Sequence, residues 1–263
     1  METERRRWTP LEARKQFREN KLTCPTRGMC DGYVQCNLVV LPESLAYDFL
    51  LFAQRNPQAC PVLEVSDTGA RGLRYLAEDV DIARDFPKYC VYENGVLTDT
   101  CDCVDQLWRE DLVSFLIGCS LSFEEELIDA RVLREESTRG GVVSVYQTNI
   151  PCVPAGVFSG DMVVSMRPIP REKVSQAVML TGAMPRVHGA PVHIGEPGAI
   201  GIADLKNTDF GGGIVSLKED EVPVFWACGV TPQAVVMKSK PEFVITHAPG
   251  HMLITDRKNS ELK

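Results

Sequence analysis

The sequence predicts an α/β protein: a main body of mixed sheet with helices on its faces, and a smaller inserted α+β subdomain. Strand-like segments alternate with amphipathic helical segments over most of the 263 residues. A chain of this length can also bury a sizeable core. A compact strand-strand-helix-strand group lies between residues 141 and 195. We therefore expect a main body formed by residues 1–140 and 196–263, and a subdomain formed by residues 141–195.

The first half of the chain contains the predicted elements of the main body. Thr9 is a suitable N-cap, and Pro10 fits the first position of a helix that continues to about Asn20. Apolar runs and helical periodicity between turn residues predict strands at 33–41, 61–65 and 88–91, and helices at 43–55 and 105–117. Ser122 and Glu125 have the spacing of a capping box, which predicts another helix from this point.

The second half contains the predicted subdomain and the end of the main body. The subdomain pattern predicts strands at 142–150, 162–168 and 191–194, and a helix at 172–180. A glycine-rich loop is expected at 204–213. The remaining predicted elements are strands at 222–226, 243–246 and 252–255, and a short helix at 232–237 that Thr231 caps.

Composition excludes several classes of protein. The net charge of −8 and the absence of a long basic run argue against nucleic-acid binding. No apolar run approaches the roughly 20 residues that span a bilayer, so we expect no membrane partner. Ten cysteines without a secretory signal indicate reduced thiols and a cytoplasmic protein. A homodimer is the default expectation for such a protein.

The stretch 186–198 contains two of only four histidines, His188 and His193, among glycines and prolines that prevent a helix. Chemistry is often found on such irregular backbone. Five residues on extended backbone place the two imidazoles on opposite faces, so both are not expected in one site. Each histidine could instead be a structural residue whose ring is satisfied by hydrogen bonds.

Two strand-to-helix or helix-to-helix junctions have the features of ligand sites. Near residues 119–126, the hydroxyls of Ser120 and Ser122 converge on a helix N-terminus, where a carboxylate would be stabilised. Near residues 227–232, Gly229 permits close approach of a ligand and Thr231 supplies a hydroxyl. The alternative for both junctions is an ordinary cap or turn.

Six blocks in chain order resemble the D-glutamate cyclase family. They are GYVQCNL at 32–38, IGCSLSFE at 117–124, VSMRPIP at 164–170, GAPVHIG at 189–195, EVPVFWACGVTPQ at 221–233 and HAPG at 247–250. The chain departs from the family pattern at Leu121, where an aromatic residue is expected, and at Cys36, where a small residue is expected. The resemblance implies an α/β body with a smaller α+β subdomain in a compact, single-unit form.

The resemblance also implies a reaction: D-glutamate, an amino diacid, closes to 5-oxo-D-proline with loss of water, as part of amino acid metabolism. Its carboxylates require cations or helix N-termini, and its ammonium requires a general base. We expect His193 to transfer the proton, because imidazole titrates near neutrality, with His188 as a weaker candidate. Arg167 is expected to clamp a carboxylate, and Glu124 to serve as a second acid or base.

Other side chains are secondary candidates for this reaction. Donors could come from Ser120, Ser122, Gly229 and Thr231. A carboxylate that orients an imidazole could come from Asp204, Glu221 or Asp256. Cys119 is a possible nucleophile. For Arg167 the alternative is a structural salt bridge, and for Glu124 it is a solvated charge at a helix end. No step needs a cofactor, and we expect neither a cofactor nor a metal.

Other motifs in the sequence indicate no zinc site and no nucleotide-binding loop. Cys101 and Cys103 have no partners at zinc-site spacing, and Gly211–Gly213 lacks the context of a nucleotide-binding loop. Two alternatives stay open. One is a metal-assisted hydro-lyase or hydrolase acting on another small carboxylate, with His188, His193, His247 and nearby carboxylates as ligands. The other is a non-catalytic carboxylate-binding protein.

Overall fold

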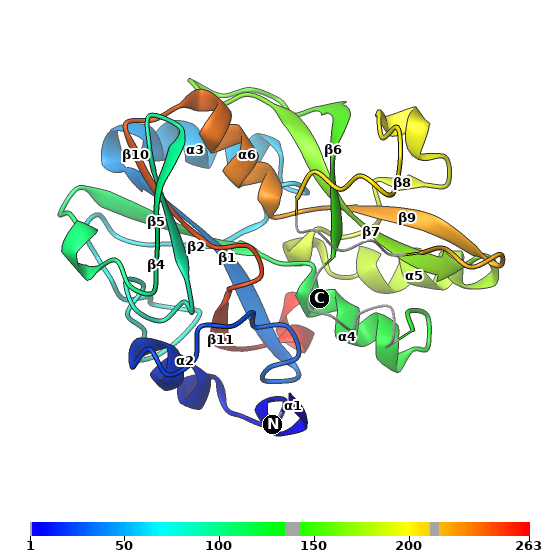
Figure 1. Cartoon of the computed structure of the whole chain (residues 1–263), viewed down its shortest axis with the longest axis horizontal. Coiled ribbons are helices and arrows are strands. Elements are labelled where there is room, and N and C mark those ends of the chain that lie inside the picture. Colours follow the sequence, from blue (N-terminus) through cyan, green and yellow to red (C-terminus); the bar gives the residue numbers. More distant parts are fainter. Residues whose placement is uncertain (1, 135–142, 211–215) are drawn as a thin grey trace.

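The computed structural model describes residues 2–134, 143–210 and 216–263. It contains two β-sheets with helices packed around them (Figure 1). Strands in the larger sheet follow the order β2-β5-β1-β10-β3-β4, with β11 also paired to β1, and the smaller sheet has the order β6-β7-β9-β8. This confirms the predicted α/β class with a second, smaller sheet.

The described strand pairs are all antiparallel, so the main sheet is not the mixed sheet that we expected. Short turns such as Asn94-Gly95 between β3 and β4 explain part of this difference, because a tight turn joins only antiparallel strands. The strands of the larger sheet are β1 (Tyr33–Pro42), β2 (Val62–Val65), β3 (Tyr89–Glu93), β4 (Val96–Cys101), β5 (Leu112–Gly118), β10 (Phe243–His247) and β11 (Leu253–Lys258).

The smaller sheet draws its strands from a longer part of the chain than the predicted subdomain. Its strands are β6 (Ser144–Pro151), β7 (Asp161–Pro170), β8 (His193–Ile194) and β9 (Glu221–Ala227). β9 lies beyond residue 195, yet it pairs with both β7 and β8. The division at residues 141 and 195 therefore stays a prediction. Residues 141–142 and 211–213, which belong to the predicted subdomain and glycine-rich loop, lie outside the described residues.

Six helices of the described chain cover these sheets. They are α1 (Glu2–Arg5), α2 (Pro10–Arg18), α3 (Glu43–Arg55), α4 (Leu121–Asp129), α5 (Val174–Gly182) and α6 (Val230–Ser239). Thr9 caps α2 through a capping box with Glu12, which confirms the predicted start of that helix. None of the helices in the described residues has both the length and the apolar composition needed to cross a bilayer.

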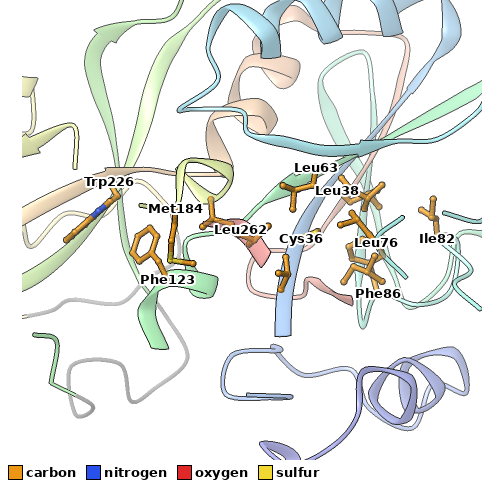
Figure 2. Packing of buried hydrophobic residues seen from close by; sticks show 14 of the residues in the cluster. Cys36, Leu38, Leu63, Leu76, Ile82, Phe86, Phe123, Met184, Trp226 and Leu262 are labelled. Carbon is orange, nitrogen blue, oxygen red and sulfur yellow. The ribbon is translucent and has the colours of Figure 1, made fainter. Parts of the chain in front are cut away.

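β1 is the centre of the larger sheet because it is apolar on both faces. Its side chains alternate between two cores: Leu38 and Val40 pack in one, while Val39 and Leu41 pack in the other against α3 and α6. The first core continues into the smaller sheet. Figure 2 shows it running from Leu38, past Phe123 of α4, to Trp226 of β9. One continuous core therefore holds the two sheets together.

The helix predicted at residues 105–117 is wrong. Asp105–Leu107 form one 3₁₀ turn, and Leu112–Gly118 form strand β5. All seven residues of β5 are buried, and the strand pairs with β1 on one side and β2 on the other. A short apolar run that is buried on both faces cannot be distinguished from a helix by periodicity alone. Pairing with two neighbouring strands decided the conformation.

Two predicted caps are also wrong. α4 begins at Leu121, so Ser122 lies inside the helix and its Oγ accepts a hydrogen bond from the Gln35 amide. α6 begins at Val230, so Thr231 lies inside its first turn. The Thr231 hydroxyl bonds the amide and the carbonyl of Val163 on β7. Tertiary contacts thus use both hydroxyls, and each helix begins two residues earlier than predicted.

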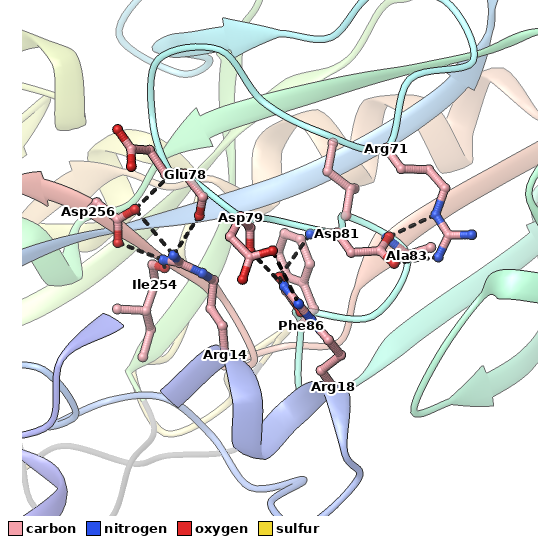
Figure 3. A network of polar contacts seen from close by, with 12 residues as sticks. Arg14, Arg18, Arg71, Glu78, Asp79, Asp81, Ala83, Phe86, Ile254 and Asp256 are labelled. Carbon is pink, nitrogen blue, oxygen red and sulfur yellow. Dashed lines mark hydrogen bonds and ion pairs between the residues drawn. The ribbon is translucent and has the colours of Figure 1, made fainter. Parts of the chain in front are cut away.

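Helix α2 is held to the larger sheet by a network of arginines, shown in Figure 3. Arg14 donates to both carboxylate oxygens of Asp256 on β11, and to the carbonyls of Ile254 and Glu78. Arg18 donates to both oxygens of the buried Asp85, from Nε at 2.8 Å and Nη2 at 2.7 Å. We call the contacts of these two arginines the α2 network.

Candidate functional site

Arg167 on β7 is the centre of a buried polar cluster, and only 3% of the residue is exposed. Its Nε and Nη2 donate to Oε1 of Glu124 at 2.8 and 2.6 Å. Nη2 also donates to Ser120 Oγ at 2.9 Å, and Nη1 donates to Ser165 Oγ at 2.8 Å. A buried cation is tolerated only with such partners, because leaving water is costly for a charge.

The strand alternation of β7 explains why Arg167 points into the protein. Ile169, two residues further on, packs in the core shared with the larger sheet, whereas Val164 and Met166 pack in a separate cluster on the opposite face. The Arg167 guanidinium also lies over the rings of Phe123 and Trp226, at 5.0 and 5.6 Å from their centroids. The aromatic rings and ion pair together hold the guanidinium in one orientation.

Glu124 has no oxygen left for proton transfer. Its Oε1 is taken by Arg167, and its Oε2 accepts from Nε and Nη2 of Arg27 at 3.1 and 2.6 Å. Burial by itself raises the pKa of this carboxyl. The charges of Arg167 and Arg27 and their hydrogen bonds outweigh burial and hold the pKa below its usual value. Glu124 is therefore suited to positioning Arg167 rather than to acid or base catalysis.

The two predicted junctions come together beside this cluster. α4 begins after β5 and α6 begins after β9, and neither N-cap residue, Ser120 or Gly229, makes a side-chain capping bond. Asn37 of β1 lies between them: its Nδ2 donates to the Gly118 carbonyl at 2.9 Å. A Cβ at Gly229 would lie 2.1 Å from the same Nδ2, so only glycine permits this approach.

Both junctions carry a cysteine. Cys119 follows the last residue of β5, and Cys228 follows the last residue of β9. Burial raises the pKa of Cys119 to about 12, although the Leu121 amide and the Arg167 charge oppose this effect. Burial also raises the pKa of Cys228, against the amides of Val230 and Gly229 and the Arg167 charge. Both thiols are therefore neutral, and each has a helix amide and Arg167 as its polar neighbours.

His188 lies in the same region and is completely buried. Its Nδ1 is 2.8 Å from the Gln58 carbonyl, so the neutral ring carries its proton on Nδ1 and a lone pair on Nε2. Nε2 has no hydrogen-bond partner among the described residues. Burial lowers the pKa of His188 to about 4, reinforced by the Arg167 charge and opposed by the carbonyls of Gln58 and Gly118.

The backbone at His188 is also unusual. Its φ of 80° is in the left-handed region, which non-glycine residues seldom adopt. The preceding residues pack on the end of β5: a Cβ at Gly118 would lie 2.2 Å from the Arg186 carbonyl oxygen. This close packing keeps the imidazole at the junction between β5 and α4.

His193 lies elsewhere. It is on β8, partly exposed, and its Nε2 is 2.7 Å from the Glu196 carbonyl. Its ring packs on Phe225, whose side chain is in the cluster on the outer face of the smaller sheet. Trp226, the next residue, faces Arg167. His193 and Arg167 are therefore on opposite faces of the smaller sheet, and the expected pairing of the two is not present.

The remaining candidates make structural contacts in other parts of the protein. Asp204 is exposed and accepts from the Lys206 amide in a turn, and Glu221 pairs with Arg134 and the Lys218 amide. Asp256 belongs to the α2 network. His247 is buried, and its Nδ1 accepts from the Leu38 amide at 3.1 Å. Burial lowers the pKa of His247 to about 4.

The three histidines that were considered as metal ligands do not form a group. Within residues 2–134, 143–210 and 216–263, no three His, Cys, Asp or Glu side chains are placed to hold one ion. A metal bound by His188, His193 and His247 together is therefore not supported by their positions.

Four residues of the site were not among the sequence candidates. Ser165 could have been found, because it is two residues from Arg167 on the same face of a strand. Asn37, like Gln35, is a polar residue in a mainly apolar buried strand, which is also informative. Cys228 had the same position after a strand as Cys119. Nothing in the sequence around Arg27 indicated that this loop residue would reach Glu124.

The fold and site define an α/β protein with a buried arginine–carboxylate centre between two uncapped helix N-termini. Comparison with known proteins agrees with the earlier resemblance, since the model of the D-glutamate cyclase family matches residues 113–256. A protein of Clostridium beijerinckii named "Putative hydro-lyase" is 62% identical over 254 residues, which is 97% of each chain. The chain therefore belongs to the D-glutamate cyclase family.

Other relatives are similar over almost their whole length. The Bacillus subtilis protein named "Putative hydro-lyase YcsI" is 54% identical over 96% of this chain and 98% of its own. A solved structure, of a nitrogen repressor-like protein MJ0159 from Methanococcus jannaschii, matches with a TM-score of 0.36 and 12% identity over 90% of this chain and 91% of that one. A similarity as low as the last carries no information on function.

Proposed function

We propose that this protein is a hydro-lyase that cyclises D-glutamate to 5-oxo-D-proline with loss of water. Its membership of the D-glutamate cyclase family and the names of its relatives support the class of reaction. The substrate is proposed from the family description together with the chemistry of the site.

The reaction places definite demands on the site. The α-ammonium gives a proton to a base, and the free amine attacks the γ-carboxyl carbon to form the new C–N bond. A C–O bond then breaks, and the leaving oxygen departs as water after it is protonated. The substrate's two carboxylates must be held throughout, and the tetrahedral oxyanion needs hydrogen-bond donors.

The meeting of two uncapped helix N-termini beside Arg167 carries this proposal. α4 and α6 have no side-chain cap. The Ser122, Phe123 and Thr231 amides donate to backbone carbonyls, which leaves the first amide of each helix, from Leu121 and Val230, and the partial positive charge of each helix end for an anion. The Asn37 side chain lies close to both helix ends, since it is bonded to the Gly118 carbonyl before α4 and packed on Gly229 before α6. Two such ends and a buried guanidinium match a substrate with two carboxylates.

We assign proton transfer to His188 rather than to His193. His188 is the imidazole close enough to Arg167 for that charge to lower its pKa, and its Nε2 lone pair is unpartnered in the described structure. A bound dianionic substrate would raise the pKa of the ring from about 4 toward the range of a general base. Glu124, with both oxygens engaged, positions Arg167.

A product assay tests the function. Purified protein is incubated with D-glutamate, and 5-oxo-D-proline is followed by chiral chromatography between about pH 6 and 9, the range in which imidazole bases act. L-glutamate and D-aspartate serve as matched substrates, because one changes the configuration and the other shortens the side chain. Formation of 5-oxo-D-proline from D-glutamate supports the proposal.

Tight binding of D-glutamate without product at any of these pH values would falsify the cyclase proposal. That result would favour the non-catalytic carboxylate-binding alternative. Dependence of turnover on an added divalent cation, removed by a chelator, would favour the metal-assisted alternative.

We also propose that the protein acts in the cytoplasm on a small molecule. All ten cysteines are free thiols, four of them partly or fully exposed, which suits a reducing compartment. Fractionation of cells and immunodetection would test this location. The expected homodimer stays a prediction that sedimentation would test.

A further inference from the structure

Cys119 and Cys228 occupy equivalent places in the two junctions. Each is the first residue after a strand, and each is directly followed by the N-cap residue of a helix of nine or ten residues. One strand belongs to the larger sheet and the other to the smaller sheet. The two thiols therefore reach the site from separate layers of the protein.

Hydrogen bonds fix the two junctions against the same groups. Ser120, next to Cys119, accepts from Arg167 at 2.9 Å. The Cys228 amide donates to the carbonyl of Val163 at 3.0 Å, four residues before Arg167 on β7. Asn37 is bonded to the carbonyl before Cys119 and is packed on the glycine after Cys228. The backbone on which both cysteines lie is thus fixed beside Asn37 and Arg167.

The surroundings of each sulfur stabilise a thiolate once it forms. The Leu121 amide faces Cys119, the Val230 and Gly229 amides face Cys228, and the Arg167 charge acts on both. Burial opposes ionisation, so the resting thiols are protonated and a base must take one proton. We assign that step to His188, which is completely buried and whose Nε2 has no partner among the described residues.

The ring closure proposed above uses neither thiol, and it neither makes nor breaks a bond at the α-carbon. The geometry points to Cys119 and Cys228 as a proton-transfer pair that exchanges the α-hydrogen of the bound amino diacid. This inference uses the substrate class of the proposed function. It adds a second activity, interconversion of the two configurations at the α-carbon.

The step balances without a cofactor. One sulfur, as thiolate, takes the α-hydrogen as a proton, and the electron pair of the broken C–H bond delocalises into the α-carboxylate. Helix N-terminal amides and Arg167 stabilise that added charge. The other thiol gives its proton to the α-carbon, so that one S–H bond breaks and one C–H bond forms. The two cysteines finish with their protonation states exchanged, and nothing is oxidised or reduced.

Exchange with deuterium tests this inference directly on the full-length wild-type protein. D-glutamate, L-glutamate and both enantiomers of 5-oxoproline are incubated separately in D₂O. Loss of the α-proton signal is followed by ¹H NMR, and configuration is followed by chiral chromatography. We expect the α-proton signal of at least one compound to decay and its mirror image to accumulate.

Cysteine variants identify the groups responsible. Cys119→Ser and Cys228→Ser are each expected to lower the exchange rate by about 10²-fold or more, and by more than they lower 5-oxoproline formation. Cys103→Ser is the control, because Cys103 is exposed and lies outside the site. Unchanged exchange in folded Cys119 and Cys228 variants overturns the inference.

The wild-type measurement remains decisive if a variant fails to fold, and its outcomes separate the two proposals. Formation of 5-oxoproline without α-proton exchange in any of the four compounds overturns this inference and leaves the cyclase intact. Exchange without 5-oxoproline formation supports the thiol pair and overturns the cyclase. The absence of both reactions overturns both.

Discussion

This protein has two networks of arginine–carboxylate ion pairs, one around Arg14 and Arg18 and one around Arg167, and their surroundings differ. In the α2 network, the described partners of Arg14 and Arg18 are carboxylates and backbone carbonyls that tie the first long helix to segments far along the chain. α2 is itself capped by Thr9. Arg14 Nε has no hydrogen-bond partner among the described residues, and the other donors of the two guanidiniums hold structure together (Figure 3).

The Arg167 cluster has a similar ion pair but different surroundings. It adjoins two helices without side-chain caps, two thiols, and an imidazole with an unpartnered nitrogen. A buried salt bridge alone therefore does not mark a site. An imidazole nitrogen without a partner and two helix ends without side-chain caps, all beside a fixed charge, do mark one, because a ligand can satisfy them.

The largest expected effect is at His188. His188→Asn keeps a residue type that tolerates the left-handed backbone and removes the imidazole. We expect the rate of 5-oxoproline formation to fall by about 10²–10⁴-fold, the usual contribution of a general base. The measurement is kcat with D-glutamate.

His193→Asn is the matched control for this change, because His193 lies on the outer face of the smaller sheet. Its kcat should stay close to that of the wild type. A folded His188→Asn variant with wild-type turnover, or a larger loss in His193→Asn, would reverse the assignment.

Arginine replacements test the comparison itself. Arg167→Lys keeps the charge but removes the planar arrangement of donors that holds Glu124, Ser120 and Ser165. We expect kcat/KM to fall by about 10²-fold, since small displacements in a site have effects of that size. Arg14→Lys should leave the kcat/KM of the folded fraction nearly unchanged. An equal loss in both variants would show that the two networks do not differ in function.

A change in the α2 network should lower the stability of the protein and leave its activity unchanged. Asp256→Asn leaves the buried Arg14 guanidinium without its carboxylate, and we expect the free energy of unfolding to fall by about 1–3 kcal/mol. Urea denaturation measures this change. The kcat of the variant below its unfolding transition should match that of the wild type, and a loss of turnover at full folding would contradict a purely structural network.

The smallest expected effect is on the pH dependence of stability. Glu124 and Asp85 should change the free energy of unfolding with pH in opposite directions. The pKa of Glu124 is lowered in the folded state, so its stabilisation is complete above its unfolded pKa and is lost as pH falls through the folded value. Burial raises the pKa of Asp85 despite its bonds to Arg18, so its contribution decreases as pH rises from the unfolded toward the folded value.

Denaturation of two variants between about pH 3 and 6 tests these signs. Glu124→Gln should flatten the rise of the free energy of unfolding with pH, because a group that binds more protons when unfolded is gone. Asp85→Asn should steepen that rise. Identical slopes in wild type and both variants would show that neither carboxyl has a shifted pKa.

Local sequence patterns were enough to predict the elements with a strong apolar or helical pattern, and the resemblance to the family. β1, α3 and the start of α2 follow from an apolar run, a helical periodicity and a capping box, which act over a few neighbouring residues. Arg167 and the two junctions were also predicted, because a charged residue in a strand and a glycine after one are locally unusual.

How these strands, helices and candidate side chains are arranged in space depends on contacts between distant parts of the chain. β5 became a strand because β1 and β2 pair with it on both sides, which its own residues do not encode. His188 and His193 are five residues apart, yet packing against β5 buries the first and the outer face of the smaller sheet takes the second. Arg27 and Glu124 lie 97 residues apart in the chain. Local sequence does not distinguish His188 from His193, or a helix from a strand at residues 112–118. Burial and pairing between distant segments do.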